Sequence, residues 1–298
     1  MTVHIVESSP TPDQVRAVTE IISRATEIDG TAPISEQAVR AISVGDGSRH
    51  LLALDGDDVV GYANVVAAQS DSEDAVDMAE GVVDPEHRGR GVGTALVDAA
   101  VTGSGRIWAH GQLPAAVRVA EKLTLTSVRE LLQMRRPTTE TLPELVVPDG
   151  ISLRTYRESD DAEILRVNNA AFAWHPEQGG WTQDDIDQRR SEPWFDPAGL
   201  FVATPADEPN HVLGFHWTKV HAPEGADPQL GEVYVVGIDP AAQGRGLGRL
   251  LTLAGLHYLE SKGPAVLLYV ESDNSAAVHT YDRLGFTRFH VDVAYARA

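Results

Sequence analysis

A glycine-rich turn late in the chain has the residue types that bind an anion. Gln243 is followed by G-R-G-L-G, in which Gly244, Gly246 and Gly248 alternate with larger residues. Because these positions carry no side chains, successive backbone N–H groups are free to face a ligand, and a helix that starts here adds a partial positive charge. The turn is therefore predicted to bind a phosphate or pyrophosphate group.

Two other interpretations of this turn compete with phosphate binding. The first is that the glycines serve only a tight connection between a strand and a helix. The second is a dinucleotide site of the Rossmann type, whose fingerprint needs glycines directly after the strand and an acidic residue at the end of the next strand. Here D-P-A-A-Q separates the strand from the glycines, and the strand over 265–270 leads to Glu271 without a ribose-binding context.

The turn occurs twice in the chain. D-P-E-H-R-G-R-G-V-G at 84–93 aligns without a gap with D-P-A-A-Q-G-R-G-L-G at 239–248, a distance of 155 positions. Farther on, 114–125 aligns with 275–286 at a distance of 161 positions, so the second half has 161 − 155 = 6 more residues between these blocks. Loops tolerate an insertion of that length at small cost. Two copies of one fold explain this pattern better than one large domain.

The elements that must position these turns follow the same order in both halves. Apolar periodicity and turn residues predict in the first half helices over 12–25, 35–42, 94–102 and 114–122, and strands over 3–6, 51–54, 59–66, 77–83, 106–109 and 129–135. In the second half they predict helices over 159–172, 182–192, 247–261 and 275–283, and strands over 151–156, 200–203, 212–220, 233–238, 265–270 and 287–296.

Length and composition fit two domains joined by a linker. A chain of 298 residues allows two domains that each bury a core. The proline-rich and acidic segment P-T-T-E-T-L-P-E-L-V-V-P-D-G predicts an N-terminal domain over 1–137, a linker over 138–150 and a C-terminal domain over 151–298. No segment resembles a membrane span, and the start lacks the features of a signal peptide, so a cytoplasmic protein is expected.

Charge and cysteine content narrow the chemistry. The formal net charge of −20 repels nucleic acid and anionic membranes and favours a cationic substrate such as an amine. The absence of cysteine excludes disulfides, thiolate metal sites and a cysteine nucleophile, and the scattered histidines lack zinc-ligand spacing. We therefore expect no metal, no nucleic-acid partner, no membrane partner and a monomer.

Both turns, with Q-x-x-G-x-G in the second, resemble the acyl-CoA pyrophosphate loop of the GNAT N-acetyltransferases. The tandem arrangement, H-P-E-Q-G-G-W-T at 175–182 and L-Y-V-E-S-D-N-S-A-A-V-H-T-Y-D-R-L-G-F at 268–286 extend the resemblance to the mycothiol synthase family. It implies an α/β (α+β) fold of two tandem GNAT acetyltransferase domains, each a mixed, mostly antiparallel central sheet flanked by helices. It also implies an acetyl-CoA-dependent enzyme that acetylates the cysteinyl amine of cysteinyl-glucosaminyl-inositol, the final step of mycothiol biosynthesis.

The resemblance also implies which residues bind acetyl-CoA. In GNAT enzymes a bulge splays the fourth strand from the fifth, which frees backbone groups for the pantetheine arm and the thioester carbonyl. Gly237 is expected to let the cofactor approach. In the second half the matching positions are Val236, Gly237, Ile238, Gln243, Gly244, Arg245, Gly246, Leu247, Gly248, Arg249 and Asn274. In the first half they are Gly81, Val82, Val83, Arg88, Gly89, Arg90, Gly91, Val92 and Gly93.

Two residues match the catalytic positions of the family. Glu232 precedes the loop on its strand, where GNAT enzymes hold a general base; since an α-amino group has a pKa of about 7.7–8.0, an ordinary carboxylate suffices. Tyr281 lies two helical turns after Asn274, where the family has the general acid for the departing thiolate. The alternatives are an exposed glutamate at a strand end and a tyrosine that packs on the sheet.

The first half differs at these positions. In the ungapped alignment Asp77 stands where Glu232 stands, and Ala120 stands where Tyr281 stands. We therefore expect the first half to bind acetyl-CoA without turnover and the second half to carry catalysis.

Four residues are candidates for acceptor binding, because buried sugar and inositol hydroxyls need hydrogen-bond partners. Lys219 ends a strand expected to flank the cleft, Tyr269 lies on the neighbouring strand, and Glu177 lies in a loop between two helices. Glu36 begins a helix of the first half, where it also complements the helix dipole. Each is equally explained as an ordinary surface or packing residue.

Two alternatives to this function remain open. One is a GNAT acetyltransferase for another amine, such as an aminoglycoside, a polyamine or a protein N-terminus. The other is a regulatory protein that binds acyl-CoA without turnover. The presence of Glu232 and Tyr281 in one half argues against a pure binder, because sensing needs neither.

Overall fold

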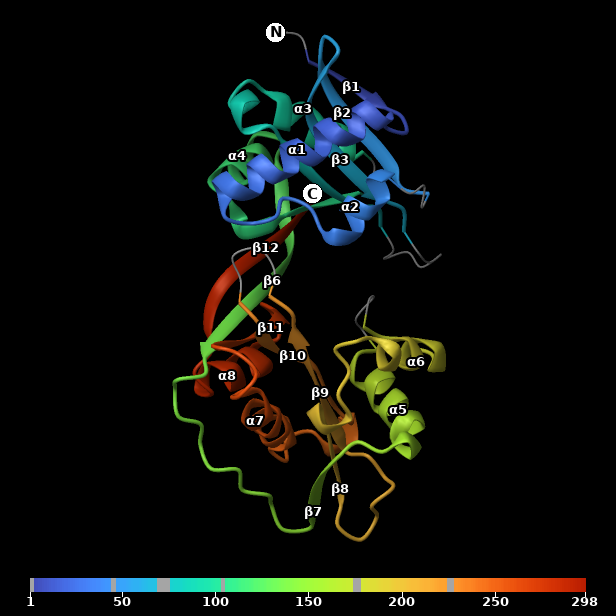
Figure 1. The fold of residues 1–298 in the computed structure, drawn as a ribbon, viewed down its shortest axis with the longest axis vertical. Coiled ribbons are helices and arrows are strands. Elements are labelled where there is room, and N and C mark those ends of the chain that lie inside the picture. The colour runs from blue at the N-terminus through green and yellow to red at the C-terminus, as the bar shows by residue number, and fades with distance from the viewer. Residues whose placement is uncertain (1–2, 44–46, 69–75, 103–104, 174–177, 224–227) are drawn as a thin grey trace. The chain divides into compact units, whose positions relative to one another are not determined.

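The computed structural model describes residues 3–43, 47–68, 76–102, 105–173, 178–223 and 228–298, and their contacts divide the chain into two compact units (Figure 1). The first unit comprises 1–132, 271–273 and 290–298, and the second comprises 133–270 and 274–289. Two strands, β6 (Leu125–Pro137) and β12 (Thr287–Arg297), therefore run from one unit into the other.

The first unit is a mixed sheet with helices on both faces. Its strands are β1 (Val3–Glu7), β2 (Arg49–Asp55), β3 (Asp58–Val66), β4 (Met78–Val83) and β5 (Arg106–Ala109). Pairing is antiparallel except between β4 and β5, and β5 is followed in the sheet by the last part of β12, where Val293 pairs with Ala109. Helices α1 (Pro12–Asp29) and α2 (Glu36–Ser43) share one apolar cluster, and α3 (Val92–Ala100) and α4 (Pro114–Lys122) share another.

The second unit repeats this order. Its strands are β7 (Ile151–Thr155), β8 (Leu200–Pro205), β9 (Gly214–His221), β10 (Leu230–Ile238) and β11 (Ala265–Glu271), with β10 and β11 parallel and the others antiparallel. Figure 1 shows α5 (Asp161–Ala171) and α6 (Gln183–Ser191) on one side of the strands and α7 (Leu247–Leu259) and α8 (Ser275–Arg283) on the other. The predicted order of helices and strands is confirmed in both halves, with boundaries shifted by a few residues.

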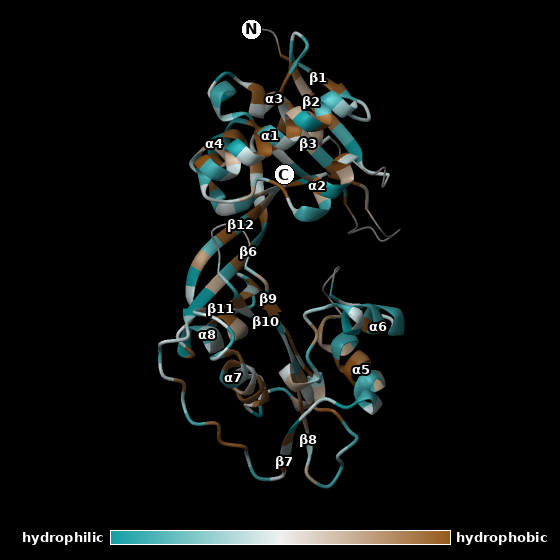
Figure 2. Cartoon of the chain, viewed as in Figure 1, coloured by the Kyte–Doolittle hydropathy of each residue, from teal (hydrophilic) through white to brown (hydrophobic). Residues whose placement is uncertain are grey.

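Local sequence signals explain where the helices begin and how they pack. Thr11 and Gln14 form a capping box at the start of α1, and Gly30 ends it in the left-handed conformation. Helix α7 lies so close to the sheet that a Cβ at Gly255 would stand 2.1 Å from the His216 ring. Glycine at 255 is therefore required for the contact between α7 and the sheet. In contrast, α6 is mostly hydrophilic (Figure 2) and buries only Ile186.

A β-bulge in β10 corrects the ungapped alignment of the two halves. Opposite β9, Val233 pairs with Thr218 and Val235 with Trp217, so that Tyr234 is an extra residue. The corresponding pairing of β3 with β4 runs from Gly61 to Val66 without a shift. We matched the two strands by their pairing partners, counting backwards from the glycine turns. Because β4 lacks the bulged residue, Met78 and not Asp77 is the counterpart of Glu232.

The six additional residues of the second half do not all lie in a loop. Helix α7 has 13 residues and α3 has 9, so 13 − 9 = 4 of them lengthen the helix that follows the glycine turn.

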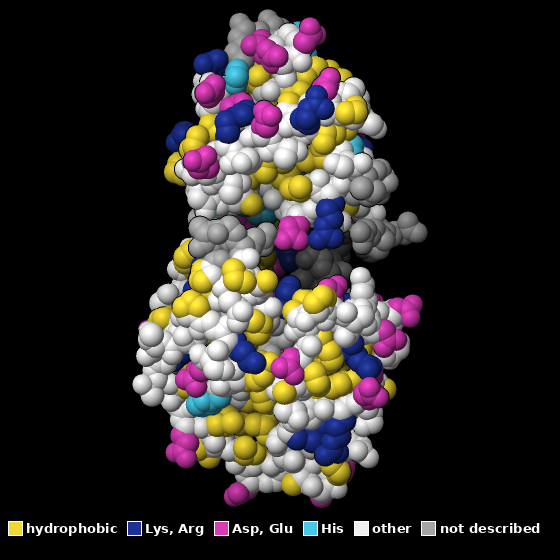
Figure 3. All heavy atoms as spheres, in the orientation of Figure 1, with side chains coloured by type: hydrophobic (Ala, Val, Ile, Leu, Met, Phe, Trp, Pro, Cys, Tyr) yellow, Lys and Arg dark blue, Asp and Glu magenta, His cyan; other side chains and the backbone are white. Residues whose placement is uncertain are grey.

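Acidic and basic side chains are interspersed on the face shown in Figure 3. Among the helices in the described ranges, none combines the length and apolar character needed to cross a bilayer.

Candidate active site

The second glycine turn has the geometry of an anion cradle. Gly244 and Gly246 have φ of 76° and 77°, and a Cβ at either position would meet no atom within 4 Å. Gly246 is the N-cap of α7, and no side chain caps the first turn of that helix. Backbone N–H groups at a helix start without a side-chain cap bind anions well. The residues here therefore fit a phosphate or pyrophosphate group.

Strand β10 separates from β11 before it reaches this turn. The parallel pairing covers Gly231, Glu232 and Val233 and stops at the bulge. Val236 and Ile238 lie beyond it, so one edge of β10 has no strand partner there among the described residues. Gly237 packs against Phe215, because a Cβ at this position would stand 2.6 Å from the Phe215 ring. This packing by itself requires glycine, and the expected approach of the cofactor at Gly237 stays a prediction.

Glu232 is a buried side chain with a histidine partner. It is 6% exposed, and its Oε2 lies 2.6 Å from Nε2 of His221 on β9. The alternative of an exposed strand-end glutamate is therefore wrong. A buried carboxylate requires such a partner. Sequence reasoning missed His221. The feature that could have indicated it is its position two residues after Lys219 on the preceding strand.

Tyr281 lies on α8, which begins after Asn274 as predicted. The side-chain oxygen of Asn274 accepts a hydrogen bond from the Ala277 N–H at 3.2 Å, so Asn274 caps the helix. The Tyr281 ring packs edge-on against Phe286, with 5.8 Å between ring centroids. Burial raises the pKa of Tyr281 to about 12. The phenol is therefore protonated at neutral pH, which a proton donor requires.

Lys219 pairs with Glu232 across β9 and β10 and lies between two aromatic rings. Its Nζ is 5.3 Å from the ring centroid of Trp194 and 5.6 Å from that of Tyr234, the bulged residue. Such contacts fix an ammonium group that would otherwise be mobile. The bulge therefore places a cation beside the candidate base.

The structure gives the surroundings of two of the other acceptor candidates. Tyr269 is half exposed on β11, and its hydroxyl accepts a hydrogen bond from Nε2 of Gln133 at 2.7 Å. Glu36 belongs to the first unit, where it is exposed and pairs with Arg40 one helical turn later. Glu177 lies outside the described residues. Their predicted roles remain predictions.

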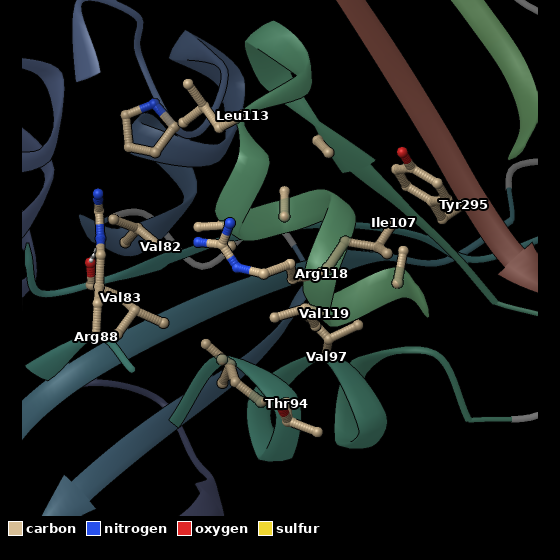
Figure 4. A pocket seen from close by; sticks show the side chains of 18 of the residues that line it. Val82, Val83, Arg88, Thr94, Val97, Ile107, Leu113, Arg118, Val119 and Tyr295 are labelled. Carbon is tan, nitrogen blue, oxygen red and sulfur yellow. Dashed lines mark hydrogen bonds between the residues drawn. The ribbon is translucent and has the colours of Figure 1, made fainter. Parts of the chain in front are cut away.

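The first unit contains a cavity of about 340 Å³ beside the matching turn. Gly81, Val82 and Val83 line it where β4 has passed the end of its pairing with β5, and Gly89, Gly91 and Gly93 line it at the turn. Figure 4 shows Arg118 extending from α4 into this space, with Val82, Val83 and Arg88 on one side. The first copy therefore also offers an anion cradle that opens into a partly open cavity.

Arg88 differs from its counterpart Gln243. Its guanidinium makes two hydrogen bonds of 2.7 Å to the Asp29 carboxylate and a third to the Val83 carbonyl oxygen. Gln243 is exposed. The Arg88 side chain therefore ties the turn to α1, and the backbone of the turn is what remains for a ligand.

A mostly buried cluster that sequence reasoning missed lies at the edge of this cavity. His110 stands between Glu80 of β4 and Asp292 of β12, with nitrogen-to-oxygen distances of 3.6 Å and 3.4 Å. The backbone N–H groups of Ser35 and Gly111 donate to Glu80 and Asp292, respectively. Burial lowers the pKa of His110, but the two carboxylates outweigh burial and raise it to about 9.

The raised pKa of His110 predicts that the stability of the first unit depends on pH. The contribution is full below the unfolded pKa of about 6.5 and is lost as pH rises through 9, with a magnitude of ~3 kcal/mol. Urea unfolding at pH 6.5 and pH 9.5 is expected to show this loss in the wild type and to show much less of it in His110→Gln. A His257→Gln variant, changed at a half-exposed histidine of the second unit, serves as control. Equal pH slopes in wild type and His110→Gln would contradict the role of the cluster.

Comparison with known proteins identifies both halves. The family model described as Acetyltransferase (GNAT) family matches residues 167–286, and the one described as Acetyltransferase (GNAT) domain matches residues 46–124. The chain is 64% identical to the mycothiol acetyltransferase of Rhodococcus erythropolis over 94% of this chain and 95% of the relative. It is 54% identical to the mycothiol acetyltransferase of Mycolicibacterium smegmatis over 95% of each chain.

The chain belongs to the mycothiol acetyltransferase family. Solved GNAT structures share its fold: a GCN5-related N-acetyltransferase from Sphaerobacter thermophilus has a TM-score of 0.70 at 22% identity and covers 98% of this chain and 94% of its own. A tandem GNAT protein from the clavulanic acid pathway has a TM-score of 0.65 at 17% identity and covers 99% and 98%. The predicted tandem GNAT fold and acetyltransferase activity are therefore confirmed.

GNAT acetyltransferases use acetyl-CoA, and the two glycine turns described above fit its pyrophosphate. In the part of the chain that the structure describes, no group of three or more histidine, aspartate or glutamate side chains is arranged to hold a metal ion.

Proposed function

We propose that this acetyltransferase transfers the acetyl group of acetyl-CoA to the cysteinyl amine of cysteinyl-glucosaminyl-inositol, the last step of mycothiol synthesis, and that its second unit carries the reaction. The names of the full-length relatives support the substrate class. The observation that carries the division of labour concerns the two matched catalytic positions. The second unit has the buried carboxylate Glu232 and the protonated phenol Tyr281 there, whereas the first unit has Met78 and Ala120.

In this proposal, the residues of the second unit act in sequence. Bound acetyl-CoA supplies the acetyl group as a thioester. Glu232, held by His221, accepts a proton from the substrate ammonium, directly or through a water, which leaves the amine nucleophilic. Backbone N–H groups of β10 after the bulge donate to the thioester carbonyl oxygen. The amine nitrogen then bonds to the carbonyl carbon, and the C–S bond breaks as Tyr281 donates its phenolic proton to the departing thiolate. The nitrogen loses its second proton, which restores the Tyr281 phenol, and Glu232 releases the first proton to solvent, so that the products are an amide and free CoA.

The acceptor is proposed to lie against the face of β9 and β10 that carries Lys219 and Glu232. That face also holds Trp194 and Tyr234, whose rings fix the lysine ammonium. An ammonium donates three hydrogen bonds, which suits sugar or inositol hydroxyls. The acceptor roles of Tyr269, Glu36 and Glu177 stay predictions.

The first unit is proposed to bind a CoA compound through its own turn without turnover. Its cavity supports binding, and the absence of a hydroxyl at Ala120 removes the proton donor. The expected role of its residues is therefore to hold the ligand and not to react with it.

Release of free CoA with a panel of amines tests this function. Cysteinyl-glucosaminyl-inositol is expected to raise CoA release far above background, and an aminoglycoside, a polyamine and a peptide N-terminus are expected not to. Preference for one of the other amines would replace the proposed acceptor. Failure of every amine to raise the rate would contradict catalysis altogether and favour a regulatory acyl-CoA-binding protein.

A further inference from the structure

Two positions that are aromatic in the second unit are small or aliphatic in the first. Ala120 and Leu125 precede Tyr281 and Phe286 by 161 positions, the offset of the two halves in this region. The strand pairings support this offset, because Ala79 pairs with Ile107 as Val233 pairs with Leu268. In the second unit the two rings pack on each other. In the first unit both replacements line the 340 Å³ cavity.

The cavity has an anion-binding side and an apolar side. The glycines of the turn line one part of it, where their backbone N–H groups are available to an anion. Ile107, Val97 and Tyr295 line the part opposite Val82 and Val83 (Figure 4), and Leu96, Ala120 and Leu125 add further apolar walls. A ligand that fills this space therefore has an anionic group and an apolar end.

An acetyl group is a poor match for the apolar side. Atoms that line an unfilled cavity lack van der Waals partners on that side. A ligand group that fills the cavity restores these contacts and is therefore bound more tightly. Each methylene buried from water contributes ~0.8 kcal/mol, which is about fourfold in affinity. Where the second unit fills this region with the rings of Tyr281 and Phe286, the first unit has room for additional carbon atoms of a ligand.

We propose that the cavity of the first unit binds a CoA thioester whose saturated acyl chain is longer than acetyl, about four to six carbons, and holds it without turnover. This inference rests on the proposed binding of a CoA compound by the first unit. The anionic end occupies the turn over 88–93, the pantetheine arm follows Gly81, Val82 and Val83, and the acyl chain occupies the space beside Ala120 and Leu125.

Calorimetric titration of the full chain measures this preference directly. The chain carries Gly248→Val so that the second turn is blocked, and CoA, acetyl-CoA, butyryl-CoA and hexanoyl-CoA are titrated separately. Butyryl-CoA, with two more methylenes, is expected to bind roughly fifteenfold more tightly than acetyl-CoA. Equal affinities, or tighter binding of acetyl-CoA, would overturn the inference.

A double variant tests whether the missing rings create the preference. Ala120→Tyr with Leu125→Phe, in the same Gly248→Val background, introduces the ring pair of the second unit and is expected to abolish the gain from butyryl-CoA. If circular dichroism shows that it does not fold, the smaller change Ala120→Val is used, with a reduced gain expected. An undiminished gain in a folded variant would refute the assignment of the acyl site.

The same titrations separate this inference from the proposed function. If no CoA compound binds when the second turn is blocked, CoA binding by the first unit fails and the inference fails with it. If acetyl-CoA and butyryl-CoA bind equally and Gly93→Val abolishes both, the first unit binds CoA compounds but the chain-length preference is wrong. Tighter butyryl-CoA binding that Gly93→Val abolishes supports both.

Discussion

Replacing Gly246 and Gly248 with valine is expected to abolish acetyl transfer, whereas replacing Gly91 and Gly93 is expected to leave turnover largely intact. The reason is that a side chain in the second turn would occupy the space in front of the N–H groups that begin α7. At Gly248 a Cβ would approach only Ile238, at 4.0 Å, so the protein itself has room for it. The loss is therefore expected from blocked ligand binding and not from unfolding. Initial rates of CoA release measure it.

Single variants at the two turns provide the matched control. Gly246 and Gly91 have positive φ, where valine is strained by roughly 1–2 kcal/mol. Gly248 and Gly93 lie within helices and lack this complication, so Gly248→Val against Gly93→Val compares the same change in the two units. Equal loss of activity in both variants would refute the assignment of catalysis to the second unit.

Tyr281→Phe is expected to lower turnover to below a tenth of the wild-type rate. The phenol is the candidate proton donor to the thiolate, and general acid catalysis contributes ~10²–10⁴-fold in rate. The ring is retained in phenylalanine, so the contact with Phe286 is preserved and the fold should be unaffected. Because burial places the pKa of Tyr281 at about 12, the loss is expected to be similar at pH 7 and pH 9.

Tyr258→Phe is the control for this substitution. Tyr258 belongs to α7 in the same unit, and its hydroxyl donates to Asp196, outside the proposed site. Activity near the wild-type value is expected for Tyr258→Phe in steady-state assays. An unchanged rate in Tyr281→Phe would eliminate the phenol as the acid, and an equal loss in both variants would show that the effect is structural.

The order of helices and strands was predictable because its signals are local. Apolar periodicity, capping residues and the glycine turns act over a few positions, and the repeat let each half check the other. The bulge at Tyr234 was not located, because V-Y-V-V-G is a continuous strand-forming run in which no residue is marked as the extra one. The superposition of Asp77 on Glu232 failed for that reason.

Long-range features of the site could not be predicted from local sequence patterns. The partner of Glu232 is a histidine on another strand, and the burial of this glutamate depends on the packing of the whole sheet. The cluster around His110 joins residues from β4, the turn that follows β5 and the last strand of the chain. Nothing in the sequence near any one of them indicates the others. The candidate residues themselves came from matching the two copies, which located positions but not their surroundings.

The last strand has a consequence for how such a protein can evolve. Residues 290–298 follow the second glycine turn in the sequence, yet they complete the sheet of the first unit and supply Asp292 and Tyr295 to it. Deleting the second half of the gene would therefore remove a strand from the sheet of the first unit. If the first unit does not catalyse, as proposed, this shared strand would keep the two copies in one gene and leave the first unit available to acquire a different ligand.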